Sequence, residues 1–238
     1  MALRVAGLVL LFLACLPLHL LAKVLGASHW PPRFLAAAAW IIGARVRTEG
    51  DPVRAHSLLI ANHTSWLDIL VLSAATRCTF VSKDQLGHGF IHWLADQNST
   101  VYVQRSDRKG AKDQALAIAR SLDREQPVAL FPEGTTGPGD QLLPFRSTLL
   151  ESAVLASKDV EVRPVAIDYG AAATEIAWFN EPAKDNALRI LGRKGHLPVV
   201  VDLLQPLDRA ADRKQMSEEG HEVIAARLSA SSSAPAGL

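Results

Sequence analysis

Short apolar runs alternate with longer mixed segments through most of the chain after residue 53. The runs end at polar or Gly/Pro-rich turns, as buried strands do, and the segments between them repeat apolar residues at helical spacing. This alternation predicts an α/β fold, a mostly parallel mixed sheet flanked by helices. We expect strands over residues 57–61, 78–82, 100–103, 127–131, 160–167 and 197–203, and helices over residues 65–75, 85–96, 108–123, 146–157 and 217–228.

The N-terminal pattern differs, because residues 5–22 carry no formal charge and lie between Arg4 and Lys23. That length is near the minimum for a membrane span. A second apolar segment, residues 34–44, follows Pro31-Pro32 and is too short to cross a bilayer. Two apolar helices joined at a Pro-Pro turn predict a hairpin that dips into one leaflet. A single span followed by a core helix remains an alternative.

These patterns divide the chain into three parts. We expect a membrane-associating helical hairpin over residues 1–47, the α/β domain over residues 48–228 and a disordered tail over residues 229–238, which contains a Ser-Ser-Ser-Ala-Pro-Ala-Gly run. Hydrophobic residues make up 49% of the 238 and charged residues 21%, with a mean hydropathy of +0.13. The chain is therefore more hydrophobic than a typical soluble enzyme and more polar than a protein with many membrane spans, which favours a peripheral membrane protein.

Charge narrows the class further. The net charge is +1, but the first 48 residues contain basic side chains and no acidic one. Basic residues beside apolar segments favour the anionic cytoplasmic leaflet, so we expect the cytoplasmic face of the inner membrane, with monotopic or single-span attachment. No basic stripe with interleaved aromatic residues suggests nucleic acid. The two cysteines fit neither a disulfide framework nor a metal site, and a reducing compartment is expected.

A first candidate site follows the predicted strand 57–61, in the stretch Asn-His-Thr-Ser-Trp-Leu-Asp. His63 and Asp68 are five residues apart and would face different directions on one continuous helix. We therefore place His63 in the turn and Asp68 in the first helical turn, with Thr64 or Ser65 as the N-cap. Asp68 can then orient the imidazole, whose other nitrogen takes a proton from a hydroxyl. Taken alone, the spacing is weak evidence, because a capping turn with an incidental histidine is the commoner outcome.

A second turn, Phe-Pro-Glu-Gly-Thr-Thr-Gly at residues 131–137, changes that balance. It resembles the Phe-Pro-Glu-Gly-Thr motif of the glycerolipid acyltransferases, and the His63 turn resembles their His-x4-Asp motif. The two motifs occur in the family's order and at about its spacing. The resemblance extends to Val162-Arg163-Pro164-Val165, which is similar to the family's fourth motif.

Three cations lie near these turns, and the resemblance assigns each of them to the acceptor. Lys83 follows a predicted strand, Arg105 resembles the arginine of the family's second motif, and Arg146 lies in the Pro-Phe-Arg sequence. Lys and Arg suit a phosphate. A solvated surface charge is the alternative for each, and Arg105 is the strongest candidate.

The phosphate-binding assignment extends to the second turn. Gly134 permits close backbone approach, and Thr135 or Thr136 adds donors. Glu133 would repel a phosphate, so we expect it to orient Arg105 or a substrate hydroxyl. Backbone amides near Gly134 or around His63 are candidates for stabilising an oxyanion.

The resemblance implies transfer of a fatty acyl group from acyl-CoA or acyl carrier protein to a lysophospholipid hydroxyl. A 1-acyl-sn-glycerol 3-phosphate acceptor, giving phosphatidic acid, is the first choice. Thr136-Gly137 replaces the family's more usual Arg-Ser, which affects the acceptor side and makes lyso-ornithine lipid, whose head group has no phosphate, the alternative. A non-catalytic membrane lipid-binding module is the alternative of another class. A secretory signal peptide is disfavoured, because export would separate the domain from both acyl donors.

We expect no metal and no cofactor beyond the acyl co-substrate. His88 and His92 have the spacing of a helical metal pair, but no carboxylate base lies between them and no third ligand is evident. The sequence also has neither a Walker A loop nor a Gly-x-Gly-x-x-Gly motif.

Overall fold

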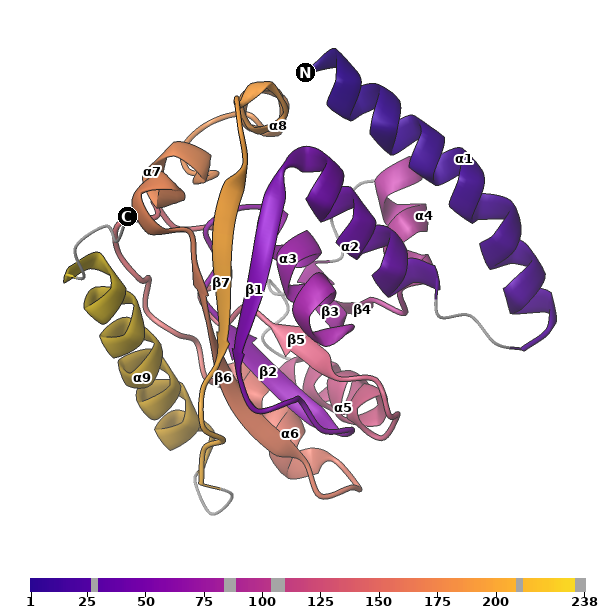
Figure 1. The fold of residues 1–238 in the computed structure, drawn as a ribbon. Helices are drawn as coiled ribbons and strands as arrows, with labels where there is room; N and C mark the ends of the chain where they lie inside the picture. The colour runs from indigo at the N-terminus through magenta and orange to yellow at the C-terminus, as the bar shows by residue number, and fades with distance from the viewer. Residues whose placement is uncertain (27–29, 84–88, 104–109, 209–211, 234–238) are drawn as a thin grey trace.

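A central sheet of mixed direction organises the molecule (Figure 1). The computed structural model describes residues 1–26, 30–83, 89–103, 110–208 and 212–233. The sheet order is β1-β7-β6-β2-β5-β3-β4, and of the pairings in it β6–β7 is antiparallel and the others are parallel. The strands are β1 (Ala44–Gly50), β2 (Ser57–Ala61), β3 (Thr79–Lys83), β4 (Val101–Val103), β5 (Val128–Leu130), β6 (Glu161–Asp168) and β7 (Leu197–Leu203). The predicted fold class, a mostly parallel mixed sheet flanked by helices, is confirmed.

Helices cover both faces of this sheet, as Figure 1 shows. Alternate residues of β2 explain why, since Leu59 and Ala61 join one apolar core while Leu58 and Ile60 join the other, and all four are buried. The longer helices are α1 (Ala2–Val24), α2 (Trp30–Ile42), α3 (Leu67–Thr76), α4 (Phe90–Gln97), α5 (Ala111–Leu122), α8 (Ala183–Gly192) and α9 (Arg213–Ser233). The shorter ones are η1 (Thr148–Leu150), α6 (Glu151–Leu155), η2 (Gly170–Ala172) and α7 (Ala173–Ile176).

Three adjacent parallel strands position the candidate site. β2 lies between β5 and β6, and all three run in the same direction. Their carboxyl ends therefore meet at one edge of the sheet, where the segments after Ala61, Leu130 and Asp168 come together.

The N-terminal segment forms the two expected helices, and α1 packs against α2 (Figure 1). α2 begins at Trp30 and takes both prolines into its first turn, where a missing N–H costs little. The boundary predicted after residue 47 is wrong, because β1 begins at Ala44 and pairs with β7 along its whole length. The second apolar segment therefore leads directly into the sheet.

The C-terminal half departs from the expected elements in three places. The helix predicted over residues 146–157 is shorter, consisting of η1 and α6. α7 and α8 lie in a region for which no element was predicted. α9 continues to Ser233, so the disordered tail predicted from residue 229 is wrong for residues 229–233, and residues 234–238 lie outside the described part.

Candidate active site

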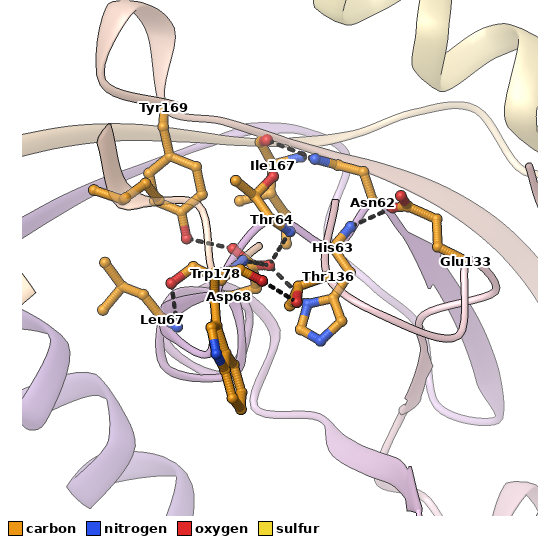
Figure 2. Close-up of polar contacts among 12 residues, drawn as sticks. Asn62, His63, Thr64, Leu67, Asp68, Glu133, Thr136, Ile167, Tyr169 and Trp178 are labelled. Carbon is orange, nitrogen blue, oxygen red and sulfur yellow. Dashed lines mark hydrogen bonds and ion pairs between the residues drawn. The ribbon is translucent and has the colours of Figure 1, made fainter. Parts of the chain in front are cut away.

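His63 and Asp68 face each other across the turn between β2 and α3 (Figure 2). β2 ends at Ala61 and α3 begins at Leu67, so the histidine lies in the turn and the aspartate in the first helical turn, as the spacing predicted. The His63 Nδ1 to Asp68 Oδ2 distance is 2.8 Å. This contact assigns the proton to Nδ1 and leaves Nε2, on the far side of the ring, with its lone pair available for a substrate proton.

The Asp68 carboxylate is fully buried and organises the turn around itself. Its Oδ2 also accepts the N–H groups of Thr64 at 2.6 Å and Ser65 at 2.8 Å, while Oδ1 accepts the hydroxyl of Tyr169 at 2.6 Å. These donors offset the free-energy cost of burying an anion. The assigned cap residue is Trp66, whose side chain makes no capping bond, but the hydroxyl of Ser65, one of the two expected caps, accepts the Leu67 N–H at 3.4 Å.

The His63 ring packs against Phe131 in addition to its hydrogen bond with Asp68. It stacks on Phe131 with ring centroids 4.0 Å apart and an interplanar angle of 14°. The side chain is 17% exposed, which keeps most of it out of water while leaving part of its surface reachable. Phe131 belongs to the second motif, so the two turns share a packing contact.

Glu133 joins the two motif turns through the backbone. Its Oε1 accepts the N–H of His63 at 2.6 Å and its Oε2 accepts the N–H of Leu143 at 3.0 Å. The Gly137 N–H also donates to the His63 carbonyl at 2.7 Å, so both the N–H and the carbonyl of His63 are bonded to the second turn. Burial raises the pKa of Glu133 to about 7, and the Asp68 charge adds to this shift while the two N–H bonds oppose it.

These bonds differ from the role expected for Glu133, which was to orient Arg105 or a substrate hydroxyl. The glutamate is buried and supports the His63 turn. Arg105 lies outside the described residues, as does His88. Lys83 ends β3, beside β5, and its side chain is likewise outside the described part.

Gly134, Thr135 and Arg146 were also predicted to contact the acceptor. Gly134 adopts a φ of +78°, which glycine tolerates best, and its N–H donates to the Phe131 carbonyl at 3.1 Å. Thr135 is exposed. The side chain of Arg146 is also exposed, while its N–H donates to the Pro132 carbonyl at 2.9 Å.

The candidate oxyanion donors are largely engaged within the protein. The N–H groups of His63, Thr64 and Ser65 donate to carboxylates, and those of Gly134 and Gly137 donate to carbonyl groups. These five N–H groups are therefore not free to donate to the carbonyl oxygen of a reacting thioester.

Three residues of the site were missed from the sequence. Asn62 exchanges two bonds with the backbone of Ile167, at 3.0 and 2.7 Å, and so fastens the turn to β6. Tyr169 follows β6 and reaches Asp68. The backbone N–H of Trp178 donates to the Thr64 carbonyl at 2.9 Å, and the Trp178 carbonyl accepts the Thr136 hydroxyl. Asn62 adjoins the first motif, but Tyr169 and Trp178 are distant in sequence and no spacing marks them.

The described residues contain no cluster of three or more His, Cys, Asp or Glu side chains able to hold a metal ion. The Nε2 atom of His92 instead lies 3.8 Å from Oδ1 of Asp96 on the same helix, and the His92 ring stacks on Tyr102.

A family model described as Acyltransferase matches residues 45–168, just over half of the chain. The chain belongs to the acyltransferase family. The match begins in β1 and ends with β6, and therefore includes both motif turns. Acyltransferase membership thus rests on the part of the chain that builds the site.

Among curated acyltransferases, the chain is 33% identical to "Lyso-ornithine lipid O-acyltransferase" of Rhodobacter capsulatus, over 87% of this chain and 82% of that protein. It is 35% identical to the protein of the same name from Rhizobium meliloti, over 88% and 79%. It is 36% identical to "1-acyl-sn-glycerol-3-phosphate acyltransferase" of Neisseria gonorrhoeae, over 56% and 52%.

A solved acyltransferase shares the fold. The crystal structure of the 1-acyl-sn-glycerophosphate acyltransferase PlsC from Thermotoga maritima matches with a TM-score of 0.61 and 19% identity, over 87% of this chain and 80% of that one. At this identity the match supports the architecture alone.

Proposed function

We propose that this acyltransferase moves a fatty acyl group from a thioester, acyl-CoA or acyl carrier protein, to the hydroxyl of a lysolipid, with His63 as the general base. The observation that carries the mechanism is the 2.8 Å contact between His63 and a buried Asp68, which leaves the opposite ring nitrogen for the acceptor.

In the reaction, His63 Nε2 takes the proton of the acceptor hydroxyl as its oxygen bonds to the thioester carbonyl carbon. Asp68 stabilises the imidazolium that forms. The tetrahedral intermediate collapses by breaking its carbon–sulfur bond, and the departing thiolate receives the proton from His63. Ester and free thiol leave, so the histidine ends neutral and no acyl-enzyme is required.

We propose lyso-ornithine lipid as the acceptor in preference to 1-acyl-sn-glycerol 3-phosphate. The Rhodobacter and Rhizobium relatives named for the former align over 82% and 79% of their length, whereas the gonococcal relative named for the latter aligns over 52%. Thr136 supports this choice. It stands where the resemblance places an arginine, and its hydroxyl donates to the Trp178 carbonyl, so this position supplies no cation for a phosphate.

1-Acyl-sn-glycerol 3-phosphate is the second candidate, supported by the 36% identity to the gonococcal relative over the motif region. On this alternative, Lys83, Arg105 and Arg146 would bind the phosphate. The non-catalytic lipid-binding module is the third candidate, and an intact His63–Asp68 pair disfavours it.

Purified protein offered each lysolipid with labelled acyl-CoA or acyl carrier protein tests the proposal. We expect labelled ornithine lipid from wild type, and a loss on the order of 10²- to 10⁴-fold in His63→Ala. Labelled phosphatidic acid alone would select the second acceptor. Lipid binding without turnover, unchanged in His63→Ala, would select the binding module.

We further propose that α1 and α2 hold the protein on one leaflet at the cytoplasmic face of the inner membrane. α1 is 23 residues long, is the one described helix with the length and hydropathy of a span, and is mostly exposed. Both of its ends are bonded to the body of the protein. Arg4 donates to the Ile190 and Gly195 carbonyls at 3.1 and 2.8 Å, and His19 and Lys23 bond to Gln97 at 3.0 and 3.3 Å.

A further inference from the structure

Tyr169 reaches the candidate base pair from a different part of the chain. It follows the last residue of β6, lies 101 positions from Asp68 in sequence, and is 4% exposed. Its hydroxyl lies 2.6 Å from Asp68 Oδ1, the carboxylate oxygen opposite the one that contacts His63 (Figure 2). A chain of two hydrogen bonds therefore runs from Tyr169 through Asp68 to the imidazole.

The two Asp68 oxygens are supported differently. On Oδ2, the donors beside His63 are two backbone N–H groups of the turn itself, Thr64 and Ser65. On Oδ1, the donor is the Tyr169 hydroxyl, which a point substitution can remove without altering the backbone. A side-chain donor on a buried carboxylate both restrains its rotation and withdraws charge from it.

We propose that Tyr169 is a positioning residue that sets the orientation and proton affinity of the His63–Asp68 pair. This inference rests on the proposed function, because it assigns Tyr169 to the same base. Burial raises the pKa of Tyr169 well above its ordinary value, and the Asp68 charge and hydrogen bond add to the shift, so the phenol stays protonated and remains a donor.

The direction of the effect follows from charge. Removing the hydroxyl leaves more negative charge on Asp68, which then stabilises the protonated imidazole more strongly. The His63 ring would bind its proton to a higher pH and act as a base over a narrower range. Among the described residues, the ionisable groups bonded to the pair are Tyr169, after β6, and Glu133, whose Oε1 accepts the His63 N–H from the turn after β5.

The chain provides a matched control, because it contains two tyrosines. Tyr102 also donates to a carboxylate, Asp96 Oδ1 at 2.7 Å, on α4 and away from the His63 turn. Tyr102→Phe and Tyr169→Phe thus remove the same kind of bond, and the second alone removes it from Asp68.

The test follows the His63 ring by NMR as pH changes, with His63→Ala identifying its signal, and needs no substrate. We expect Tyr169→Phe to move the ring's titration midpoint up by about half to one pH unit, and Tyr102→Phe to leave it in place. The rising limb of kcat/KM against pH should move with it, and kcat/KM at neutral pH should fall about tenfold. Equal midpoints in wild type and Tyr169→Phe would overturn the proposal.

A second measurement keeps the proposal testable if Tyr169→Phe folds poorly. Incorporating 3-fluorotyrosine into the Tyr102→Phe protein labels Tyr169 alone with a more acidic phenol, which is a stronger donor of nearly the same size. The midpoint should then move to lower pH, and no shift or an upward one would contradict the proposal. Failure of the proposed function would appear separately, as a wild-type protein that transfers no acyl group while the ring titration still responds to Tyr169.

Discussion

Asp68 is held by bonds that leave little freedom for a replacement. Its two oxygens together accept four donors, from His63, Thr64, Ser65 and Tyr169. Asp68→Asn would turn an amide NH₂ toward donors on one side and remove the charge that stabilises the imidazolium. We expect kcat/KM to fall on the order of 10²- to 10⁴-fold.

Asp185→Asn is the control for this variant. Asp185 lies in the first turn of α8, as Asp68 lies in the first turn of α3, but it is exposed. Steady-state acyl transfer should therefore match wild type in Asp185→Asn. Comparable losses in both variants would mean that the role we assign to Asp68 is wrong.

Glu133 makes folding stability depend on pH. Its pKa is raised to about 7, above its ordinary value of 4.5, so the native state holds this proton over a range in which the unfolded chain has released it. The free energy of unfolding should therefore decrease as pH rises from about 4.5 to about 7, by roughly 2–3 kcal/mol from this group. Urea unfolding at a series of pH values measures the slope.

Glu133→Gln is the comparison for that slope. The amide does not titrate, so its stability should vary less with pH over this range, even though an NH₂ group facing the Leu143 N–H lowers stability overall. Parallel pH profiles for wild type and Glu133→Gln would show that this carboxylate ionises normally.

Residue-level prediction worked where the partners lie close in sequence. His63 and Asp68 are five residues apart, so a turn and one helical turn suffice to bring them together. Tyr169 and Trp178 join the site because β6 lies beside β2, a pairing that no local pattern specifies. The backbone role of Glu133 was missed for the same reason, since its partner His63 is 70 residues away.

At the scale of elements, α8 stabilises the site through one buried side chain. Asn186 is fully buried, accepts the Trp66 indole N–H at 2.9 Å, and donates to the Ala177 carbonyl and Glu181 Oε1 at 3.0 and 2.7 Å. It thereby connects the residue just before α3 with the segment that carries Trp178. Loss of this amide would remove the partner of the Trp66 indole N–H, whereas the Ala177 carbonyl and Glu181 Oε1 would keep their bonds to Arg189.

We therefore expect Asn186→Ala to lower the free energy of unfolding by about 2–4 kcal/mol. The rate of acyl transfer should fall as well, because the backbone of Trp178 forms hydrogen bonds with both motif turns. Lys184→Ala, an exposed change on the same helix, is the control and should unfold like wild type. Chemical denaturation of both variants checks the prediction, which fails if their midpoints coincide.

Element prediction succeeded for strands buried on both faces and for the edge strand β4, and it failed at the other edge, β1. β2 and β5 read as apolar runs because both of their faces are covered. β1 is an edge strand with Arg45, Arg47 and Glu49 along it, so its charges concealed a strand that pairs over its whole length with β7. α8 was missed because only two of its residues, Asn186 and Ile190, are buried, and one of these is polar while the apolar Leu188 is exposed.

At the scale of the whole molecule, the attachment of α1 bears on membrane topology. The helix is about 35 Å long at 1.5 Å per residue, enough to cross a hydrocarbon core. Arg4, near one end, bonds to the end of α8 and to Gly195, while His19 and Lys23, near the other, bond to Gln97 on α4. A spanning helix would have to break one of these sets and leave an end on the far side of the membrane.

Cysteine labelling in sealed, inside-out membrane vesicles distinguishes the two arrangements. Leu3 and Leu25 lie near opposite ends of α1 and are 89% and 73% exposed, so each can carry a single cysteine once Cys15 and Cys78 are replaced. A helix lying along one leaflet predicts that a membrane-impermeant maleimide added outside, on the former cytoplasmic side, labels both positions. A span predicts that one of them reacts only after the vesicles are opened with detergent, and that result would end the one-leaflet proposal while leaving the His63 chemistry untouched.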